Sequence, residues 1–218
     1  MKSVFKNFVS EISSIIRPKK VLLIFVGDLV LECLNDKYDT WRKECDMLFI
    51  HTDMSQAKMY QRFKKLKHLY IGDDDFRNTC GKREFEEGES YVDKNSDKIL
   101  KELNKHKKKK IILISTLRYS SACGITTSLF SYLHDKGYYA SVIGIKPFAF
   151  EGKSAFENYN KAIEVMDLWK DKITIIEPCD KSYNSFFISQ ILNTIIDSIN
   201  NTIRTNRFDE NCKYYSII

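Results

Sequence analysis

The sequence predicts an α/β fold: one doubly wound, mostly parallel sheet flanked by helices. Six short apolar runs alternate with segments of helix length, and this alternation is typical of buried parallel strands joined by helices. The chain has 218 residues, enough for one sizeable core, and only 8 Gly and 3 Pro interrupt it. No linker rich in serine or glycine divides it, so we expect a single domain.

The expected strands are the apolar runs at 21–26, 47–50, 68–71, 111–115, 140–145 and 173–176. Helices are expected between and after them, at about 29–44, 56–66, 87–106, 125–136, 154–170 and 183–203. The expected organisation is an N-terminal helix in residues 1–19, an α/β domain over 20–205 and a tail at 206–218.

The N-terminal segment has the pattern of an amphipathic helix. Residues 2–16 place apolar side chains on one helical face, with Lys2 and Lys6 near the start. Such helices usually pack on their own domain. Docking on a membrane surface or on a partner is the alternative for this segment.

Charge and cysteine usage narrow the class of protein. The net charge is +6, from 35 basic and 29 acidic residues, and this mild excess predicts no nucleic-acid partner. The basic run at 105–110 precedes an expected strand and is interpreted as a solvated corner. Six scattered cysteines without a C-x-x-C pair predict reduced thiols and no metal site. With no signal peptide and no long apolar segment, the expected location is the cytoplasm.

A specific motif follows the fifth expected strand, where residues 142–153 read VIGIKPFAFEGK. This segment closely resembles FtsZ, the bacterial tubulin-family division protein, which carries a strand followed by K/R-P-F-x-F-E-G-K/R. Two shorter pieces resemble the family in the same order: FIHTD at 49–53, followed by QA, and PCD at 178–180. The resemblance runs from about Lys20 to about Ile203. It implies the fold of the family's nucleotide-binding domain, without the family's second α/β domain.

The resemblance also locates the nucleotide site. The family's phosphate loop, G-G-G-T-G-T-G, aligns with Arg118–Gly124, where one glycine of five remains. Backbone N–H groups must approach phosphates closely, and glycines allow that approach. The first and third phosphate loops are reduced in the same way, to Gly27 and to Gly81 with its neighbours. On the base side, Phe186 matches a stacking aromatic, and Gln190 replaces the aspartate that reads guanine.

The positions that match the family's nucleotide contacts are Gly27, Asp53, Gly81, Arg118, Ser120, Ser121, Gly124, Pro147, Glu151, Phe186 and Gln190. No catalytic residue is assigned, because Glu210, Cys212 and Tyr215 stand where the family's hydrolysis loop has N-x-D-x-x-D. The expected cofactor is none, with GTP or GDP left open.

The predicted function is that of a degenerate FtsZ-like protein, a pseudo-GTPase that modulates filaments in cell division or the cytoskeleton. Its expected partner is an FtsZ-type filament or a second copy of the chain. The alternative is a GTP-binding, polymerising FtsZ-like GTPase with unusual phosphate loops.

Overall fold

The computed structural model describes residues 20–27, 38–52, 66–72, 85–107 and 109–177, together with Asn193 and Asp197. The predictions for residues 1–19 and 206–218 lie outside this part of the chain. So do those for 28–37, 53–65 and most of 183–203, where Asn193 and Asp197 are both helical.

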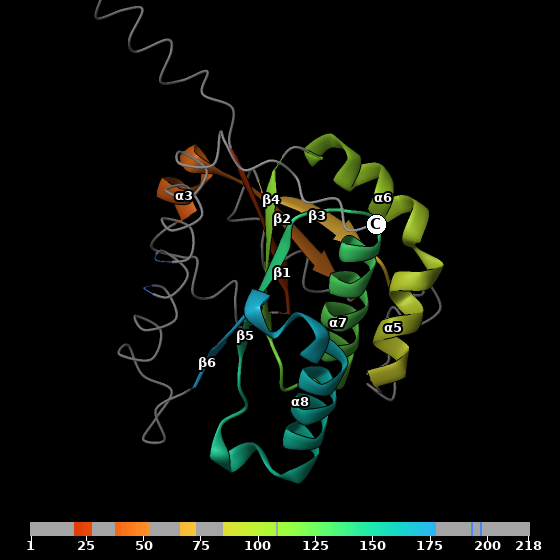
Figure 1. Ribbon diagram of the computed structural model, residues 1–218, viewed down its shortest axis with the longest axis vertical. Coiled ribbons are helices and arrows are strands. Elements are labelled where there is room, and N and C mark those ends of the chain that lie inside the picture. Colours follow the sequence, from red (N-terminus) through yellow and green to blue (C-terminus); the bar gives the residue numbers. More distant parts are fainter. Residues whose placement is uncertain are drawn as a thin grey trace, which may run out of the picture.

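One six-stranded sheet forms the centre of the molecule (Figure 1). Its strands are β1 (Val21–Val26), β2 (Cys45–His51), β3 (Lys67–Tyr70), β4 (Lys110–Thr116), β5 (Ala140–Ile145) and β6 (Ile173–Ile176). The order is β3-β2-β1-β4-β5-β6, and every neighbouring pair is parallel. The predicted fold class is confirmed, and the six expected strands differ from the observed ones by at most two residues at either end.

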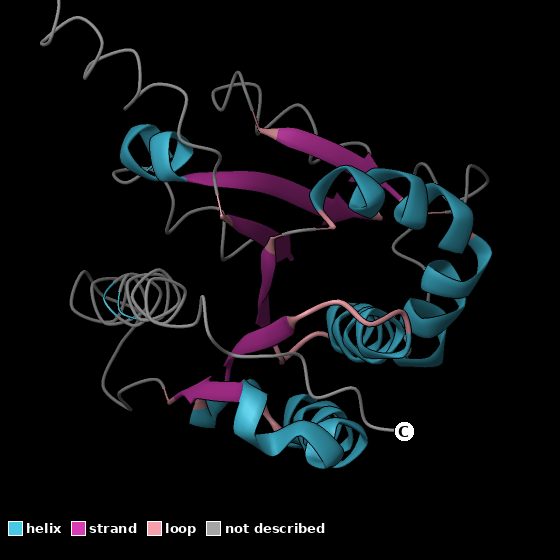
Figure 2. Ribbon diagram, turned by 45° about the horizontal axis from the view of Figure 1, so that its top comes forward, coloured by secondary structure: helices cyan, strands magenta, loops and turns pink. Residues whose placement is uncertain are grey.

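Helices cover both faces of this sheet, as parallel strands require (Figure 2). The described helices are α3 (Tyr38–Glu44), α5 (Phe85–Lys94), α6 (Ser96–Leu103), α7 (Ser120–Asp135) and α8 (Lys153–Met166). Short 3-10 turns are η2 (Asn104–His106), η3 (Ala149–Glu151) and η4 (Asp167–Lys172). α5 to α8 pack on one face, and α3 packs on the other.

The core follows from the alternation of side chains along each strand. In β1, Leu22 and Ile24 pack toward α5 to α8, whereas Leu23 and Phe25 pack on the face of α3. All six residues of β1 are buried, because β1 lies in the middle of the sheet with both faces covered.

The helix expected at 87–106 is two helices, because Asn95 interrupts it. The Asn95 side-chain amide donates to the carbonyl of Ile71, 3.0 Å away, and to the carbonyl of Tyr91, 2.9 Å away. This local bonding competes with the helix ladder and ties the break to the end of β3. The helix expected at 154–170 ends at Met166 as an α-helix, and the non-helical backbone of Trp169 bends the following 3-10 turn.

Two cysteines fall in the described part of the chain, Cys45 and Cys123, and both are buried and form no disulfide. Burial raises the pKa of the Cys123 thiol to about 12, so it stays protonated and unreactive. In the same part of the chain, no helix is both long and apolar enough to cross a bilayer.

Candidate nucleotide-site remnant

The candidate site lies where the strand order reverses. From β1, the chain moves through β2 to β3 on one side, and β4, β5 and β6 continue on the other. In open α/β sheets, ligands bind beyond the carboxyl ends of the strands at such a point. Gly27 follows β1 there, and the segment 117–119 joins β4 to α7.

Gly27 fits this position for two reasons. Its φ of +92° lies in the region that favours glycine. A Cβ on Gly27 would lie 3.3 Å from the Thr116 hydroxyl and 3.8 Å from the Ala122 Cβ. The chain therefore leaves β1 in close contact with the first turn of α7. The Thr116 hydroxyl is itself buried, and within the described residues it has no hydrogen-bond partner.

Arg118 is held by neighbours at the β4–α7 junction. Its guanidinium forms an ion pair with the Glu151 carboxylate and donates to the Tyr119 hydroxyl at 2.7 Å. The guanidinium carbon also lies 4.3 Å from the centre of the Tyr119 ring. The side chains of Arg118 and Glu151 are 20% and 14% exposed, so the pair is largely shielded from water. The Glu151 carboxylate therefore neutralises the charge of Arg118 at this junction.

Glu151 also stabilises the loop that follows β5. Its second carboxylate oxygen accepts from the backbone N–H of Phe148 at 2.9 Å. This contact caps η3, whereas α8 begins two residues later after Gly152. The capping bond of Glu151 therefore belongs to η3, and α8 has no side-chain cap. Pro147 lies in the same loop and is buried.

The segment aligned with the family's phosphate loop is mostly helix. α7 begins at Ser120, five residues earlier than expected, so Ser120 and Ser121 lie in its first turn. Tyr119 is the N-cap residue and makes no side-chain capping bond. The first N–H groups of a helix have no acceptor within it, and they favour an anion. The geometry therefore keeps a helix N-terminus at this edge of the sheet.

Gly124 has a packing role in α7. A Cβ at this position would lie 2.0 Å from the Phe85 carbonyl oxygen of α5. Gly88 of α5 meets α7 in the same way, with a Cβ only 2.3 Å from the Ser121 carbonyl oxygen. Because neither glycine has a Cβ, α5 and α7 can cross in close contact. Nucleotide contact by Gly124 stays a prediction.

The structure brings seven of the predicted site residues to this edge or to the helix that starts there: Gly27, Arg118, Ser120, Ser121, Gly124, Pro147 and Glu151. Asp53, Gly81, Phe186 and Gln190 lie outside the described residues. Sequence reasoning missed Thr116, because a threonine ending an apolar strand carries no distinctive pattern. Among the described residues, no group of three potential metal ligands occurs.

The sequence matches no protein-family profile and no curated protein. Solved structures, in contrast, match at high coverage. A GTPγS-bound protofilament of CetZ2 from Haloferax volcanii superposes with a TM-score of 0.67 and 17% identity, over 84% of this chain and 57% of that one. TubZ of Clostridium botulinum phage c-st superposes with a TM-score of 0.63 and 16% identity, over 82% of this chain and 58% of that one. An empty FtsZ dimer from M. jannaschii superposes with a TM-score of 0.66 and 16% identity, over 89% of this chain and 56% of that one.

These likenesses define the class of fold. The chain shares the Rossmann-like α/β fold of the CetZ2, TubZ and FtsZ structures, as the sequence motif implied. It spans less than two thirds of the length of each of these three structures.

Proposed function

We propose that this protein is a degenerate FtsZ-like module that hydrolyses no GTP and modulates FtsZ- or tubulin-type filaments in the cytoplasm. The observation that carries the proposal is the Arg118–Glu151 ion pair at the β4–α7 junction. Phosphates need donors that are free to approach them. Here the cation is bound to a carboxylate, and the Glu151 charge repels a second anion.

Tyr119 adds a steric argument. Its ring, 43% exposed, occupies the N-cap position of α7 and contacts the Arg118 guanidinium. A bulky side chain at this point keeps a phosphate away from the N–H groups of the first turn. Glycines in the family motif leave that approach open.

Exposed aromatic side chains at this edge support a role in protein contacts. Phe150 is 73% exposed and stacks on the buried Phe148, with ring centres 5.1 Å apart. Tyr119 is also exposed and lies in the β4–α7 junction, which the Arg118–Glu151 pair joins to the loop of Phe150; aromatic residues are enriched at binding hot spots. CetZ2 in its protofilament and FtsZ in its dimer are self-associating proteins of the same fold.

Calorimetry on purified, nucleotide-stripped protein tests the loss of the nucleotide site. We expect no micromolar binding of GTP, GDP or ATP, with or without Mg²⁺, at about 100 μM protein, where even a site of about −5 kcal/mol begins to register. Micromolar GTP binding would overturn the proposal.

Co-sedimentation with assembled FtsZ tests the filament contact. We expect Phe150→Ser to reduce the bound fraction several-fold. Leu168→Ser is the matched control, because Leu168 is 84% exposed but lies in η4, which leads into the opposite edge of the sheet. Absence of binding by the unmodified chain, together with unchanged filament length, would refute the filament role.

A GTP-binding, polymerising protein is the second candidate, and one observation favours it. The Thr116 hydroxyl and the Arg118 Nε are buried and, within the described residues, lack hydrogen-bond partners. Both are donors at the edge where a phosphate would lie. GTP-dependent sedimentation of the chain alone would distinguish this candidate from the first.

A further inference from the structure

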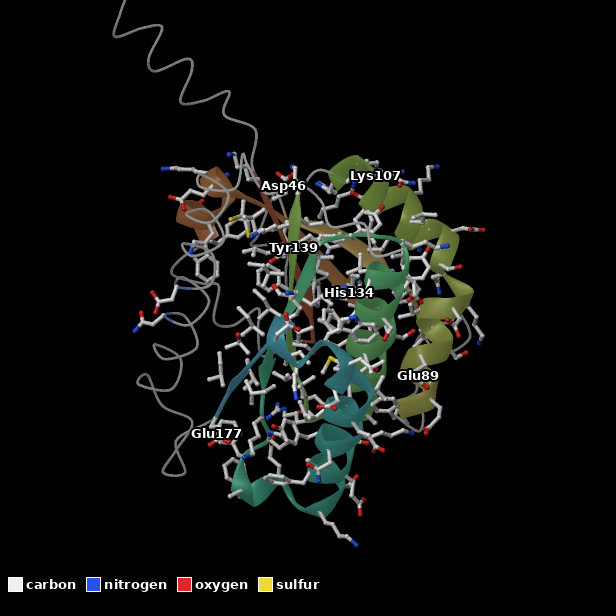
Figure 3. All side chains as sticks on the ribbon, in the orientation of Figure 1. Asp46, Glu89, Lys107, His134, Tyr139 and Glu177 are labelled. Atoms are coloured by element: carbon white, nitrogen blue, oxygen red, sulfur yellow. The ribbon has the colours of Figure 1, made fainter. Side chains whose placement is uncertain are left out.

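A second concave site lies at the opposite edge of the sheet, where the strands begin. Figure 3 shows Asp46 and Lys107 at this edge and Glu177, just after β6, at the other. The ladder between β2 and β3 starts at Leu48 and Lys67, so the first three residues of β2 extend beyond the start of β3. A hollow of about 560 Å³ opens beside them. We call it the amino-edge hollow. Its lining residues are Arg42, Lys43, Cys45, Asp46, Met47, Leu48, Lys67, Glu102, Lys105 and His106.

The two carboxylates of the hollow are already neutralised by cations. Glu102, which is nearly buried, pairs with Lys67 at 2.6 Å and with Lys105 at 2.8 Å. Burial alone would raise the pKa of Glu102, but hydrogen bonds from Lys105 and Lys67 outweigh burial and hold it below the usual value. Glu102 is therefore ionised at neutral pH and matched by two amines.

Asp46 is matched in the same way. It forms an ion pair with Lys109, and the His106 Nδ1 lies 3.2 Å from the same carboxylate. Burial and the nearby Lys109 lower the pKa of His106, so this imidazole contributes little charge at pH 7. Each of the two carboxylates in the described part of the lining thus has a cationic partner.

The cations exceed the carboxylates around the hollow. Among the described lining residues, the four cations of Arg42, Lys43, Lys67 and Lys105 face two carboxylates, those of Asp46 and Glu102. The excess is two positive charges. The amines of Lys67 and Lys105 pair with Glu102, and their side chains remain about half exposed, at 49% and 55%. An ammonium has three donors, so each can bind a further acceptor.

The shape and the floor of the hollow indicate the size of its ligand. About 560 Å³ lies within the range of small-molecule sites, roughly 300 to 1,000 Å³. Met47, which is partly exposed, supplies apolar surface beside the charged side chains. A compact dianion attached to an organic group matches both features, and a phosphate monoester carries about −1.5 to −2 charges near pH 7.

We infer that the amino-edge hollow binds a small organic phosphate monoester, with its phosphate held by Lys43, Lys67 and Lys105. This site lies at the opposite edge of the sheet from the nucleotide-site remnant and is independent of the proposed function. Cations also stabilise the C-terminal ends of helices such as α3 and α6. If stabilising these helix ends is the only role of the basic side chains, phosphates will not bind to the hollow.

Calorimetry with AMP, inorganic phosphate and adenosine on the full chain tests this inference. We expect AMP and phosphate to bind with an affinity that falls as salt rises, and adenosine to give no heat. Tighter binding of AMP than of phosphate identifies an ester site, and equal binding identifies free phosphate as the ligand. No binding of AMP at millimolar concentration overturns the inference.

Single-charge variants locate the site. Lys43→Gln and Lys67→Gln should each weaken AMP binding about fivefold, the effect of one exposed ion pair. Lys153→Gln is the matched control, because its side chain is 91% exposed and it begins α8 after the loop at the other edge. Lys43 is on the surface, so its removal leaves the fold intact. Equal weakening by all three substitutions would show nonspecific attraction and overturn the site.

Discussion

Arg118 shows how one side chain changes the chemistry of a site. In a phosphate-binding loop a cation facing the ligand would add affinity, yet here its charge is used within the protein. The guanidinium joins the β4–α7 junction to the loop after β5 through Glu151, and Glu151 in turn caps η3. Arg118 therefore has a structural role that its position in the sequence does not reveal.

Replacing Arg118 with alanine should lower the free energy of unfolding by about 1–3 kcal/mol, because a shielded Glu151 carboxylate is left without its partner. Urea denaturation measures the change. The double variant Arg118→Ala, Glu151→Gln should recover part of the loss, because it removes the uncompensated charge. Additive losses in the double variant would show that the pair contributes little.

The crossing of α5 and α7 shows how glycines position two elements. Gly88 and Gly124 sit at the contact, and either Cβ would overlap a backbone carbonyl of the facing helix. Backbone atoms cannot rotate away as flexible side chains do. These two glycines therefore set the distance between the helices, and α7 carries that geometry to its first turn at the candidate site.

Gly124→Ala should destabilise the protein by about 3 kcal/mol, at the upper end of the cost of overpacking, because its Cβ would lie 2.0 Å from the Phe85 oxygen. Gly137→Ala is the control. Gly137 has φ +73° but nothing within 4 Å of its Cβ, so only backbone strain of about 1 kcal/mol applies. Thermal or urea unfolding of both variants makes the comparison. Equal losses would contradict close packing at the crossing.

Across the whole molecule, histidines link stability to pH. Burial lowers the pKa of His68, and the charge of His51 adds to the effect. Burial lowers those of His106 and His134 as well, with smaller contributions from Lys109 and Lys172. Each imidazole binds its proton more weakly in the folded chain than in the unfolded chain, whose histidine pKa is about 6.5. Protonation of these three histidines therefore favours the unfolded chain.

Stability should decline as the pH falls from about 7.5 to about 5.5, through the unfolded pKa of about 6.5, and should change little above that range. Urea denaturation at several pH values and constant salt measures this dependence. His134→Phe keeps an aromatic ring beside Trp169 but removes one titrating group, so its decline should be shallower. A flat profile for the unmodified chain would contradict the prediction.

Local pattern accounts for the parts of the fold that the sequence predicts. Each strand of the sheet is a short apolar run, and buried parallel strands need apolar residues on both faces, so their positions can be identified without tertiary information. The break at Asn95 was missed because its cause is a contact with Ile71, 24 residues away. The early start of α7 was missed because a resemblance to a phosphate loop suggested a loop there.

The sequence by itself determined the fold class and the order of strands along the chain, because each depends on residue type at neighbouring positions. Only the tertiary structure decided that Arg118 pairs with Glu151, that Gly124 serves helix packing and that basic residues from α3, β3 and η2 share one hollow. These residues lie far apart in the chain. Strand register and helix crossing place them together, and neither is encoded by local periodicity.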